Sequence, residues 1–307
     1  MSDNPHRLPV IQANASSGAP LIFEKVAIIG LGLIGGSIAL AVRQTWPTSL
    51  VIGVDNKDVL ERAMVRHAID VAAEDPVVIA EADLVILAAP VQQNIELIAS
   101  LAQHLSHPAI VTDVSSTKRK IIEAASGLPS HLTFVGGHPL AGAPRGGIDR
   151  ARPDLFVGRP WVFTSTDDAM GDTLDRLRQF VTALGANAHV MSVTEHDHLL
   201  AYLSHLPQLV VSTLMHVVGN KVGERGLALA GRGFVDTTRL SSSPATIWKD
   251  ICATNINEIG SALDVFIAEL CEIREQLGQG EALDRVFDSA VRWRSTLATK
   301  RRERGMD

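Results

Sequence analysis

Cysteine, positive charge and long hydrophobic runs are all scarce in this chain of 307 residues. The two cysteines, Cys252 and Cys271, match no metal-binding or redox spacing, which excludes a disulfide framework and fits a reducing, cytoplasmic environment. The net charge of −6 leaves no broad basic field for binding nucleic acid. The uncharged stretch 26–42 contains four glycines and is too short for a comfortable membrane crossing, so we expect no membrane partner.

The remaining composition is that of a globular chain long enough for two domains. Hydrophobic residues make up 46% of the chain and charged residues 20%, which are ordinary values for a folded protein. The first residues are polar, rich in Ser, Ala, Pro and Asn, and lack a signal-peptide core. Residues 1–22 are therefore predicted to be a disordered lead-in.

Short apolar runs alternate with helical patterns from residue 25 to about residue 190. This alternation is typical of βαβ units on a mostly parallel sheet. It predicts strands at 25–29, 50–54, 83–88, 109–113, 132–136, 160–164 and 187–191, and helices at 34–45, 57–67, 92–104, 116–126 and 169–184. Residues 23–192 are thus predicted to form a Rossmann-like, doubly wound α/β domain.

Residues 193–307 are predicted to form an all-α domain, because the strand patterns end after residue 191. The stretch 199–218 is apolar nearly all round, which predicts a buried central helix kinked at Pro207. The run Ser241–Pro244 predicts a helix start with a serine N-cap and proline at the first helical position. A stripe at steps of four and three then needs a partner helix, from this chain or from a second subunit, and we hypothesise a homodimer. The stripe comprises Ile259, Leu263, Phe266, Leu270, Ile273 and Leu277.

A dinucleotide-binding fingerprint, Gly30-x-Gly32-x-x-Gly35, follows the first predicted strand. Gly30 allows the tight turn, Gly32 lets the backbone approach a pyrophosphate, and Gly35 lets the helix pack closely on its strand. The start of the helix presents free N–H groups to the phosphates, which places Leu33 and Ile34 in the expected cofactor site. The alternative is a glycine-rich turn without a ligand.

Asp55 closes the second predicted strand and sets the expected cofactor. A carboxylate at this position accepts hydrogen bonds from a ribose 2′-hydroxyl and repels a 2′-phosphate, so NAD is favoured over NADP. Lys57, two residues later, leaves some tolerance of NADP. After a later strand, Ala89, Pro90 and Val91 allow the cofactor to lie close to the backbone.

Two further strand ends carry side chains suited to catalysis, and ligands of open α/β sheets bind at such ends. His138 follows two glycines and precedes a proline that keeps it extended. A neutral histidine can accept the hydroxyl proton when an alcohol is oxidised by hydride transfer. The alternative is a structural histidine in a turn. Ser116 stands just before a predicted helix and either caps that helix or faces the ligand, and both can hold.

The helical half contains candidate site residues, each of which has a functional and a structural interpretation. His205 lies on a buried segment and is either a ligand contact or a core histidine. Arg239 precedes a helix and is either a surface residue or a bidentate clamp for a carboxylate. Residues Glu195–His198 alternate acids and histidines, but no further ligand has a supporting spacing. We therefore predict a solvated helix start there and no metal site.

Five segments together resemble the prephenate/arogenate (cyclohexadienyl) dehydrogenase family of tyrosine biosynthesis. In family order over about residues 25–280 they are Gly30–Ser37, Asp113–Lys118, Gly137–Gly142, Ser204–Pro207 and Gly233–Arg239. The resemblance implies a nucleotide domain followed by a helical dimerisation domain. It also implies NAD-dependent oxidative decarboxylation of prephenate to 4-hydroxyphenylpyruvate, of arogenate to tyrosine, or of both.

The resemblance further implies a role for each candidate in binding a cyclohexadienol. His138 would take the proton of the ring hydroxyl, and Ser116 would help to orient that hydroxyl and the histidine. Arg239 would pair with a substrate carboxylate, and His205 would line the pocket. The sequence departs from the family pattern at 143–145, where many relatives have threonine and glutamate, and at Val235, where some have a basic residue. Both positions border the implied pocket, so the preference between the two substrates stays open.

Two other functions are kept as alternatives. The first is a different NAD-dependent dehydrogenase, of β-hydroxyacid type, which would rely on a lysine in the helical half. Lys221 and Lys249 are the mid-domain lysines, and neither stands in a supporting motif. The second is an NAD-sensing module without catalysis, which the joint presence of His138, Ser116 and Arg239 argues against.

Overall fold

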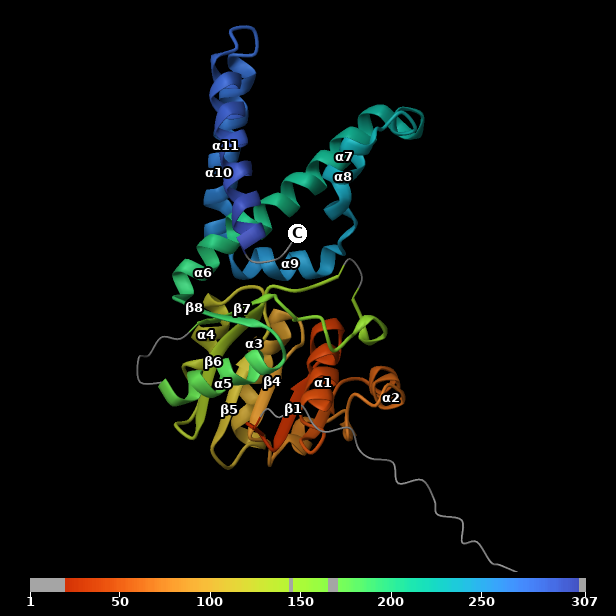
Figure 1. Ribbon diagram of the computed structural model, residues 1–307, viewed down its shortest axis with the longest axis vertical. Coiled ribbons are helices and arrows are strands. Elements are labelled where there is room, and N and C mark those ends of the chain that lie inside the picture. Colours follow the sequence, from red (N-terminus) through yellow and green to blue (C-terminus); the bar gives the residue numbers. More distant parts are fainter. Residues whose placement is uncertain (1–19, 144–145, 165–170, 304–307) are drawn as a thin grey trace, which may run out of the picture.

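The computed structural model describes residues 20–143, 146–164 and 171–303, and it consists of a sheet domain that carries two helical arms (Figure 1). The strands are β1 (Lys25–Ile29), β2 (Leu50–Val54), β3 (Val71–Ala73), β4 (Leu84–Leu87), β5 (Ala109–Asp113), β6 (Leu132–Pro139), β7 (Pro160–Thr164) and β8 (Asn187–Met191). They form one sheet in the order β3-β2-β1-β4-β5-β6-β7-β8. All neighbours pair in parallel except β6 and β7, which confirms the predicted mostly parallel fold.

The sheet differs from the prediction at two strands. Strand β3 was not predicted, because three partly exposed residues are too few to show an alternating pattern. Strand β6 continues three residues beyond the predicted end, since Gly136–Pro139 pair antiparallel with Trp161–Thr164 of β7. His138 therefore lies within a paired strand.

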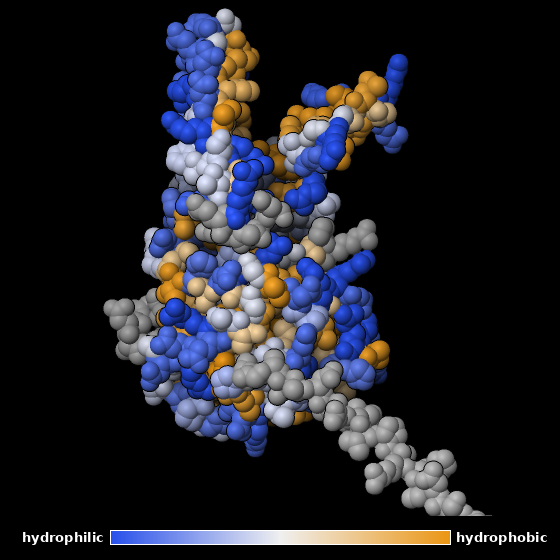
Figure 2. All heavy atoms as spheres, viewed as in Figure 1, coloured by the Kyte–Doolittle hydropathy of each residue, from blue (hydrophilic) through white to orange (hydrophobic). Residues whose placement is uncertain are grey.

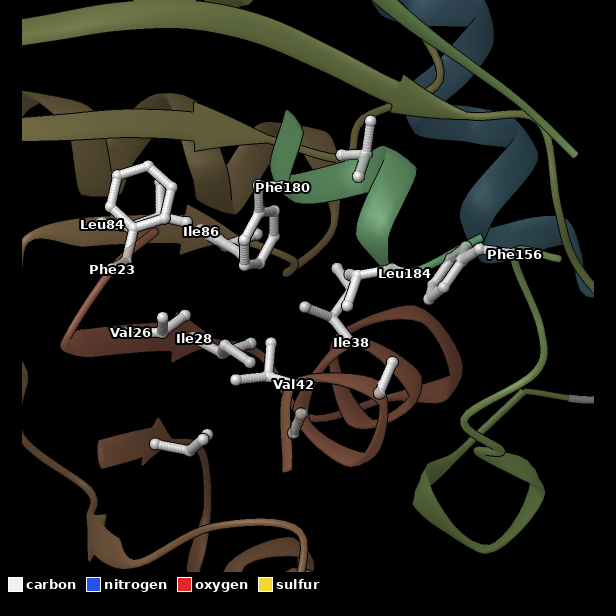
Figure 3. Packing of buried hydrophobic residues seen from close by; sticks show 14 of the residues in the cluster. Phe23, Val26, Ile28, Ile38, Val42, Leu84, Ile86, Phe156, Phe180 and Leu184 are labelled. Atoms are coloured by element: carbon white, nitrogen blue, oxygen red, sulfur yellow. The ribbon is translucent and has the colours of Figure 1, made fainter. Parts of the chain in front are cut away.

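Helices cover both faces of the sheet, as predicted for a doubly wound domain. They are α1 (Leu33–Thr45), α2 (Lys57–Val65), α3 (Val91–His104), α4 (Arg119–Ala125) and α5 (Gly171–Ala183), with short 3-10 turns at Pro76–Ile79 and Ile148–Arg150. Val26 and Ile28 of β1 pack against α1 and α5 on one face, where Val42 and Phe180 join them (Figure 3). Ala27 packs instead into the core on the opposite face of the sheet, which is covered by α3 and α4. Alternate residues of one strand thus enter two separate cores.

Residues 20–22 are the described part of the predicted lead-in 1–22. The carbonyl oxygen of Pro20 accepts a hydrogen bond from the indole N–H of Trp46 (3.0 Å), and that of Ile22 accepts one from the guanidinium of Arg176 (3.0 Å). These residues therefore contact α5 and the end of α1. Residues 1–19 lie outside the described part of the chain.

The C-terminal part is helical throughout its described residues, as predicted. Its elements are α6 (Val193–Leu200), a π-helical turn (Ala201–His205), α7 (Leu206–Leu227), α8 (Arg232–Thr238), a 3-10 turn (Arg239–Ser242), α9 (Ala245–Thr254), α10 (Ile256–Glu275) and α11 (Glu281–Glu303). Figure 1 shows α9 lying across the edge of the sheet, beneath two diverging arms formed by α7 with α8 and by α10 with α11.

Prolines lie at two helix starts of this part. Pro207, where a kink is predicted, lies in the first turn of α7, directly after the π-helical turn that interrupts the regular α-helix. Helix α9 starts at Ala245 with Pro244 as its N-cap and no side-chain cap, so the predicted serine N-cap is wrong. The helical backbone of α7 breaks at Gly223, whose φ is 61°.

The helical arms bury little of their own apolar surface. Among the described residues of this part, the buried apolar cluster comprises Ala201, Ile251, Ile259 and Ala262. Leu270 and Leu277 of the predicted stripe are 49% and 61% exposed, and Trp293 on α11 is 65% exposed. Figure 2 shows apolar side chains along the sides of both arms. Within 199–218, Leu203, Leu214 and Val217 are 74%, 37% and 50% exposed, so the prediction of a buried helix there is wrong within a single chain. The exposed apolar faces of both arms require a covering surface.

No helix among the described residues combines the length and the apolar character needed to span a bilayer.

Candidate active site

The glycine loop at the end of β1 has the shape expected of a dinucleotide site. Gly30 has a φ of +96°, and a side chain there would overlap the backbone of Ala88. A side chain at Gly35 would overlap the carbonyl oxygen of Gly30, because α1 begins so close to the strand. Gly32 has no atom within 4 Å of the place where a Cβ would lie. The loop is thus packed tightly on its inner side and open at the residue predicted to face a pyrophosphate.

A cleft of about 710 Å³ opens beside this loop. Of the predicted cofactor residues, five line it: Gly30, Gly32, Asp55, Ala89 and Pro90. Leu33, Ile34 and Gly35 form the first turn of α1 immediately behind Gly32, and Val91 starts α3 as a buried residue. The first N–H groups of α1 have no capping side chain, so they are available to an anion at this point.

Asp55 closes the far side of the loop. Its Oδ2 accepts a hydrogen bond from the backbone N–H of Leu31 (2.6 Å), and its Oδ1 accepts one from the N–H of Asn56 (2.7 Å). The carboxylate therefore holds the glycine loop against the end of β2. Oδ1 also accepts a hydrogen bond from the side-chain amide of Asn56 (2.8 Å), so Oδ2 is the oxygen that keeps a lone pair for a further donor.

A buried ion pair between Asp113 and Lys118 holds the end of β6 at Gly137, the residue before His138. The carboxylate of Asp113 accepts hydrogen bonds from the N–H groups of Ser115 and Gly137 (both 2.9 Å). The ammonium of Lys118 contacts the same carboxylate and donates to the carbonyl oxygen of Gly137 (2.7 Å). Both charged side chains are fully buried. This clamp fixes the backbone on which His138 stands.

His138 is buried, and its ring is bonded to a second histidine. Its Nδ1 lies 2.9 Å from Nε2 of His196 on α6, and Nδ1 of His196 lies 2.8 Å from Oδ1 of Asp197. Burial lowers the pKa of His138 well below the ordinary histidine value of 6.5. Electrostatic interactions with three neighbours lower the pKa of His138 further: His196, Lys118 and His205. The imidazole is therefore neutral at pH 7 and free to accept a proton.

The positions of His196 and Asp197 correct the prediction that Glu195–His198 form a solvated helix start. Glu195 and His198 are exposed, as expected for a solvated helix start, but His196 and Asp197 are fully buried. The alternating acids and histidines carry no local sign of this difference. Burial comes from α6 packing on α4 and β6, which lie far away in the sequence.

Ser116 does not cap the helix that follows it, contrary to one of its two predicted roles. Helix α4 begins at Arg119, and its first N–H groups are bound by Asp197 from α6 instead. Oδ1 of Asp197 accepts from the N–H of Lys118 (2.8 Å) and Oδ2 from that of Arg119 (2.9 Å). Within the described residues the half-buried hydroxyl of Ser116 has no hydrogen bond, which leaves it available to a ligand.

His205 ends the π-helical turn with one ring nitrogen unsatisfied. Its Nδ1 lies 3.5 Å from the amide nitrogen of Asn255, and its ring meets Trp248 edge-on at 6.1 Å. Because the Asn255 amide donates, Nδ1 accepts, and the proton belongs on Nε2, which is buried without a partner among the described residues. Burial lowers the pKa of His205 to about 4. A neutral, buried N–H donor without an acceptor fits a ligand pocket.

Comparison with known proteins decides the family. A model of the prephenate dehydrogenase nucleotide-binding domain matches residues 38–190, and one of the prephenate dehydrogenase dimerization domain matches residues 192–289. The chain belongs to the prephenate dehydrogenase family. The resemblance found in the sequence is thereby confirmed, together with a nucleotide-binding domain and a helical domain of the dimerisation type.

Relatives within the prephenate dehydrogenase family cover most of the chain. Prephenate dehydrogenase of Bacillus subtilis is 34% identical over 289 residues, which are 91% of this chain and 77% of that protein. Synechocystis arogenate dehydrogenase has a TM-score of 0.76 and 32% identity, covering 89% of this chain and 99% of that one. Prephenate dehydrogenase of A. aeolicus, solved with hydroxyphenyl propionate and NAD+, has a TM-score of 0.79 and 26% identity, covering 91% and 98%.

Arg239 is more exposed than the other predicted catalytic and substrate-binding residues, His138, Ser116 and His205. It is exposed on the 3-10 turn that precedes α9, and within the described residues its guanidinium has no hydrogen bond or ion pair. The turn itself is fixed, since the amide of Gln208 donates to the carbonyl oxygen of Leu240 (2.8 Å). A fixed turn with a free guanidinium suits a residue that waits for an anion.

Proposed function

We propose that this chain is an NAD-dependent dehydrogenase that oxidatively decarboxylates prephenate, arogenate or both. One observation carries the proposal: a neutral, buried imidazole at the carboxyl end of β6, with one nitrogen held by His196 and no partner on the other among the described residues. Such a group, at the sheet edge that also carries the dinucleotide cleft, is equipped to accept a hydroxyl proton. The family to which the chain belongs supports this choice of reaction.

In this proposal each residue has a separate task. His138 accepts the proton of the ring hydroxyl on Nε2, and the Ser116 hydroxyl hydrogen-bonds the same group. His205 donates its Nε2–H to the substrate, and Arg239 pairs with a substrate carboxylate. The cleft beside Gly32 and Asp55 would hold NAD, which would supply the hydride acceptor for the carbinol carbon. The ring carboxylate then leaves as carbon dioxide and its bonding electrons complete the aromatic ring. This step is strongly downhill, so orientation and proton removal are the protein's main contributions.

The residues of the cleft fit NAD. Gly32 leaves room for a pyrophosphate, the start of α1 supplies N–H groups, and the carboxylate of Asp55 stands where a ribose 2′-hydroxyl would donate to it. The same negative charge disfavours the 2′-phosphate of NADP. Of the predicted alternatives, a β-hydroxyacid dehydrogenase is less well supported, because Lys221 and Lys249 are both exposed.

An NADH-formation assay tests the proposal directly. The expected result is turnover with prephenate and NAD, with arogenate measured in parallel. We expect kcat/KM to fall by about tenfold or more with NADP, since an unfavourable charge contact at a bound phosphate costs ~1.5–3 kcal/mol. NADH binding without turnover of either cyclohexadienol would instead support the NAD-sensing alternative.

We further propose that the chain divides into a nucleotide-binding domain, residues 23–192, and a helical domain, residues 193–307, and that the helical domains of two copies form a homodimer. The dimerisation-domain match and the exposed apolar faces of α10 and α11 support this arrangement. Sedimentation at micromolar concentration is expected to give twice the 32.9 kDa mass of one chain. A mass equal to one chain would contradict the proposal. A Leu270→Glu change, which charges an exposed apolar position, is expected to weaken the dimer.

A further inference from the structure

We propose that His196 and Asp197 are positioning residues that orient His138 and stabilise the charge it acquires when it accepts the substrate proton. The inference rests on the proposed function, because it concerns the same base. Its basis is a continuous chain of side chains, with 2.9 Å between the two imidazoles and 2.8 Å between His196 and the carboxylate. All three side chains are buried, so water does not compete for these bonds.

The hydrogen-bond partners fix where the protons lie. An ionised carboxylate can only accept, so Nδ1 of His196 carries a proton and donates it to Asp197. Nε2 of His196 is then a bare acceptor, and Nδ1 of His138 must donate to it. This leaves Nε2 of His138 without a proton. The chain therefore selects the one neutral form of His138 in which the nitrogen not bonded to His196 is the proton acceptor.

Asp197 is itself held in its ionised form. Burial alone raises the pKa of this carboxyl, but hydrogen bonds from His196 and from the N–H groups of Arg119 and Lys118 outweigh burial and lower the pKa. The start of α4 adds the partial positive charge of its N–H groups. A carboxylate bound in this way points a fixed negative charge at the histidine pair.

The charged groups around His138 and His196 sum to zero only after His138 has accepted the substrate proton. Facing His138 are Lys118 from the start of α4, His196 and Asp197 from α6, and His205 from the π-helical turn, with Asp113 of β5 bound to Lys118. Burial keeps both partner histidines neutral by lowering the pKa of each. One lysine then stands against two carboxylates, a net charge of −1. Protonation of His138 brings this group to neutrality, which offsets part of the cost that burial places on the imidazolium.

The proton transfer itself needs only His138. The hydroxyl proton goes to Nε2 of His138, and the O–H electron pair stays on the oxygen as the carbonyl forms. No proton passes to His196 or Asp197, which keep their own protonation states. Their contribution is to hold the acceptor nitrogen in place and to offset its positive charge.

Two substitutions at His196 separate this role from simple packing. His196→Leu removes the acceptor, and we expect kcat to fall by about 100-fold or more, within the range for general-base catalysis. KM for the cyclohexadienol and NAD affinity should change by less than about threefold. His196→Gln keeps an acceptor oxygen, so its kcat should recover to within about tenfold of wild type. In His196→Leu the low-pH decline of kcat should move away from its wild-type position, because the pKa of His138 depends on its contact with His196.

The matched control is His198→Leu, two residues along the same helix, where the exposed side chain contacts Glu258 and Tyr202. This variant should retain wild-type kcat. Equal losses in His196→Leu and His196→Gln with an unmoved pH profile would overturn the inference, as would a kcat of His196→Leu within threefold of wild type.

A proton NMR measurement on the protein without added cofactor or substrate is independent of turnover. Downfield resonances of the two hydrogen-bonded Nδ1–H groups are expected in wild type, and that of His138 should be lost in His196→Leu. Absence of both resonances from folded wild type would contradict the chain of bonds. If the resonances are present but wild type turns over neither cyclohexadienol, then the proposed function fails while the hydrogen-bond chain stands.

Discussion

Replacing His138 by asparagine is expected to lower kcat by about two to four orders of magnitude, the usual contribution of a general base. Asparagine approximates the size of the imidazole and can still hydrogen-bond His196, so the fold should persist. It has no basic nitrogen, and the hydroxyl proton then has no acceptor on the protein. NAD affinity should barely change, because the cleft beside Gly32 and Asp55 is built from other elements.

The pH dependence of wild type provides a second check on the same residue. Burial lowers the pKa of His138 well below 6.5, so the neutral base is already fully formed at pH 6.5. The value of kcat/KM should therefore stay level from pH 7 through 6.5 and decline only at lower pH, where His138 becomes protonated. His189→Asn, at an exposed histidine on β8, is the control and should behave as wild type. Turnover of His138→Asn within a few-fold of wild type would remove the histidine from the mechanism.

Replacing Lys118 by methionine is expected to destabilise the protein by about 3–5 kcal/mol, the usual result of breaking one partner of a buried ion pair. The carboxylate of Asp113 would stay buried without its cation, and the carbonyl oxygen of Gly137 would lose its donor. The free energy of unfolding, measured in denaturant, is the direct readout.

Two comparisons keep this result interpretable. Lys120→Met removes an exposed lysine that pairs with Glu123 on the same helix, and it should change stability by less than about 0.5 kcal/mol. The double variant Lys118→Met/Asp113→Asn removes both charges and should recover part of the loss, since no unpaired charge remains buried. A Lys118→Met variant as stable as the control would show that the pair contributes little.

Local sequence patterns were sufficient for the sheet domain. Seven of the eight strands, the glycine loop and Asp55 each depend on residues close together in the chain, and these were found in the predicted places. Strand β3 escaped because its three residues are partly exposed. The start of α4 was misjudged because its cap comes from Asp197, which lies 79 residues away from Lys118. No pattern around Ser116 could reveal that partner.

The helical character of the C-terminal part was predicted correctly, but the burial of several of its side chains was not. Its apolar helices were recognised, yet apolarity does not say whether a face meets its own chain or another surface, and Leu270 is half exposed here. For His196 and Asp197 the error was the opposite, since they were predicted to be exposed and are buried. Their polar neighbours indicated solvent, while long-range packing on β6 and α4 places them in the interior.

The antiparallel pairing of β6 with β7 has a consequence for how this site is maintained. Many reactive side chains lie on loops that reorganise in each cycle, but His138 is held within a strand by Val162 opposite and by the Asp113 contact at Gly137. Its amide should rank among the slow exchangers of hydrogen for deuterium, opening only when the sheet opens. The entropic cost of fixing the position of His138 is thus part of folding and does not recur at each turnover.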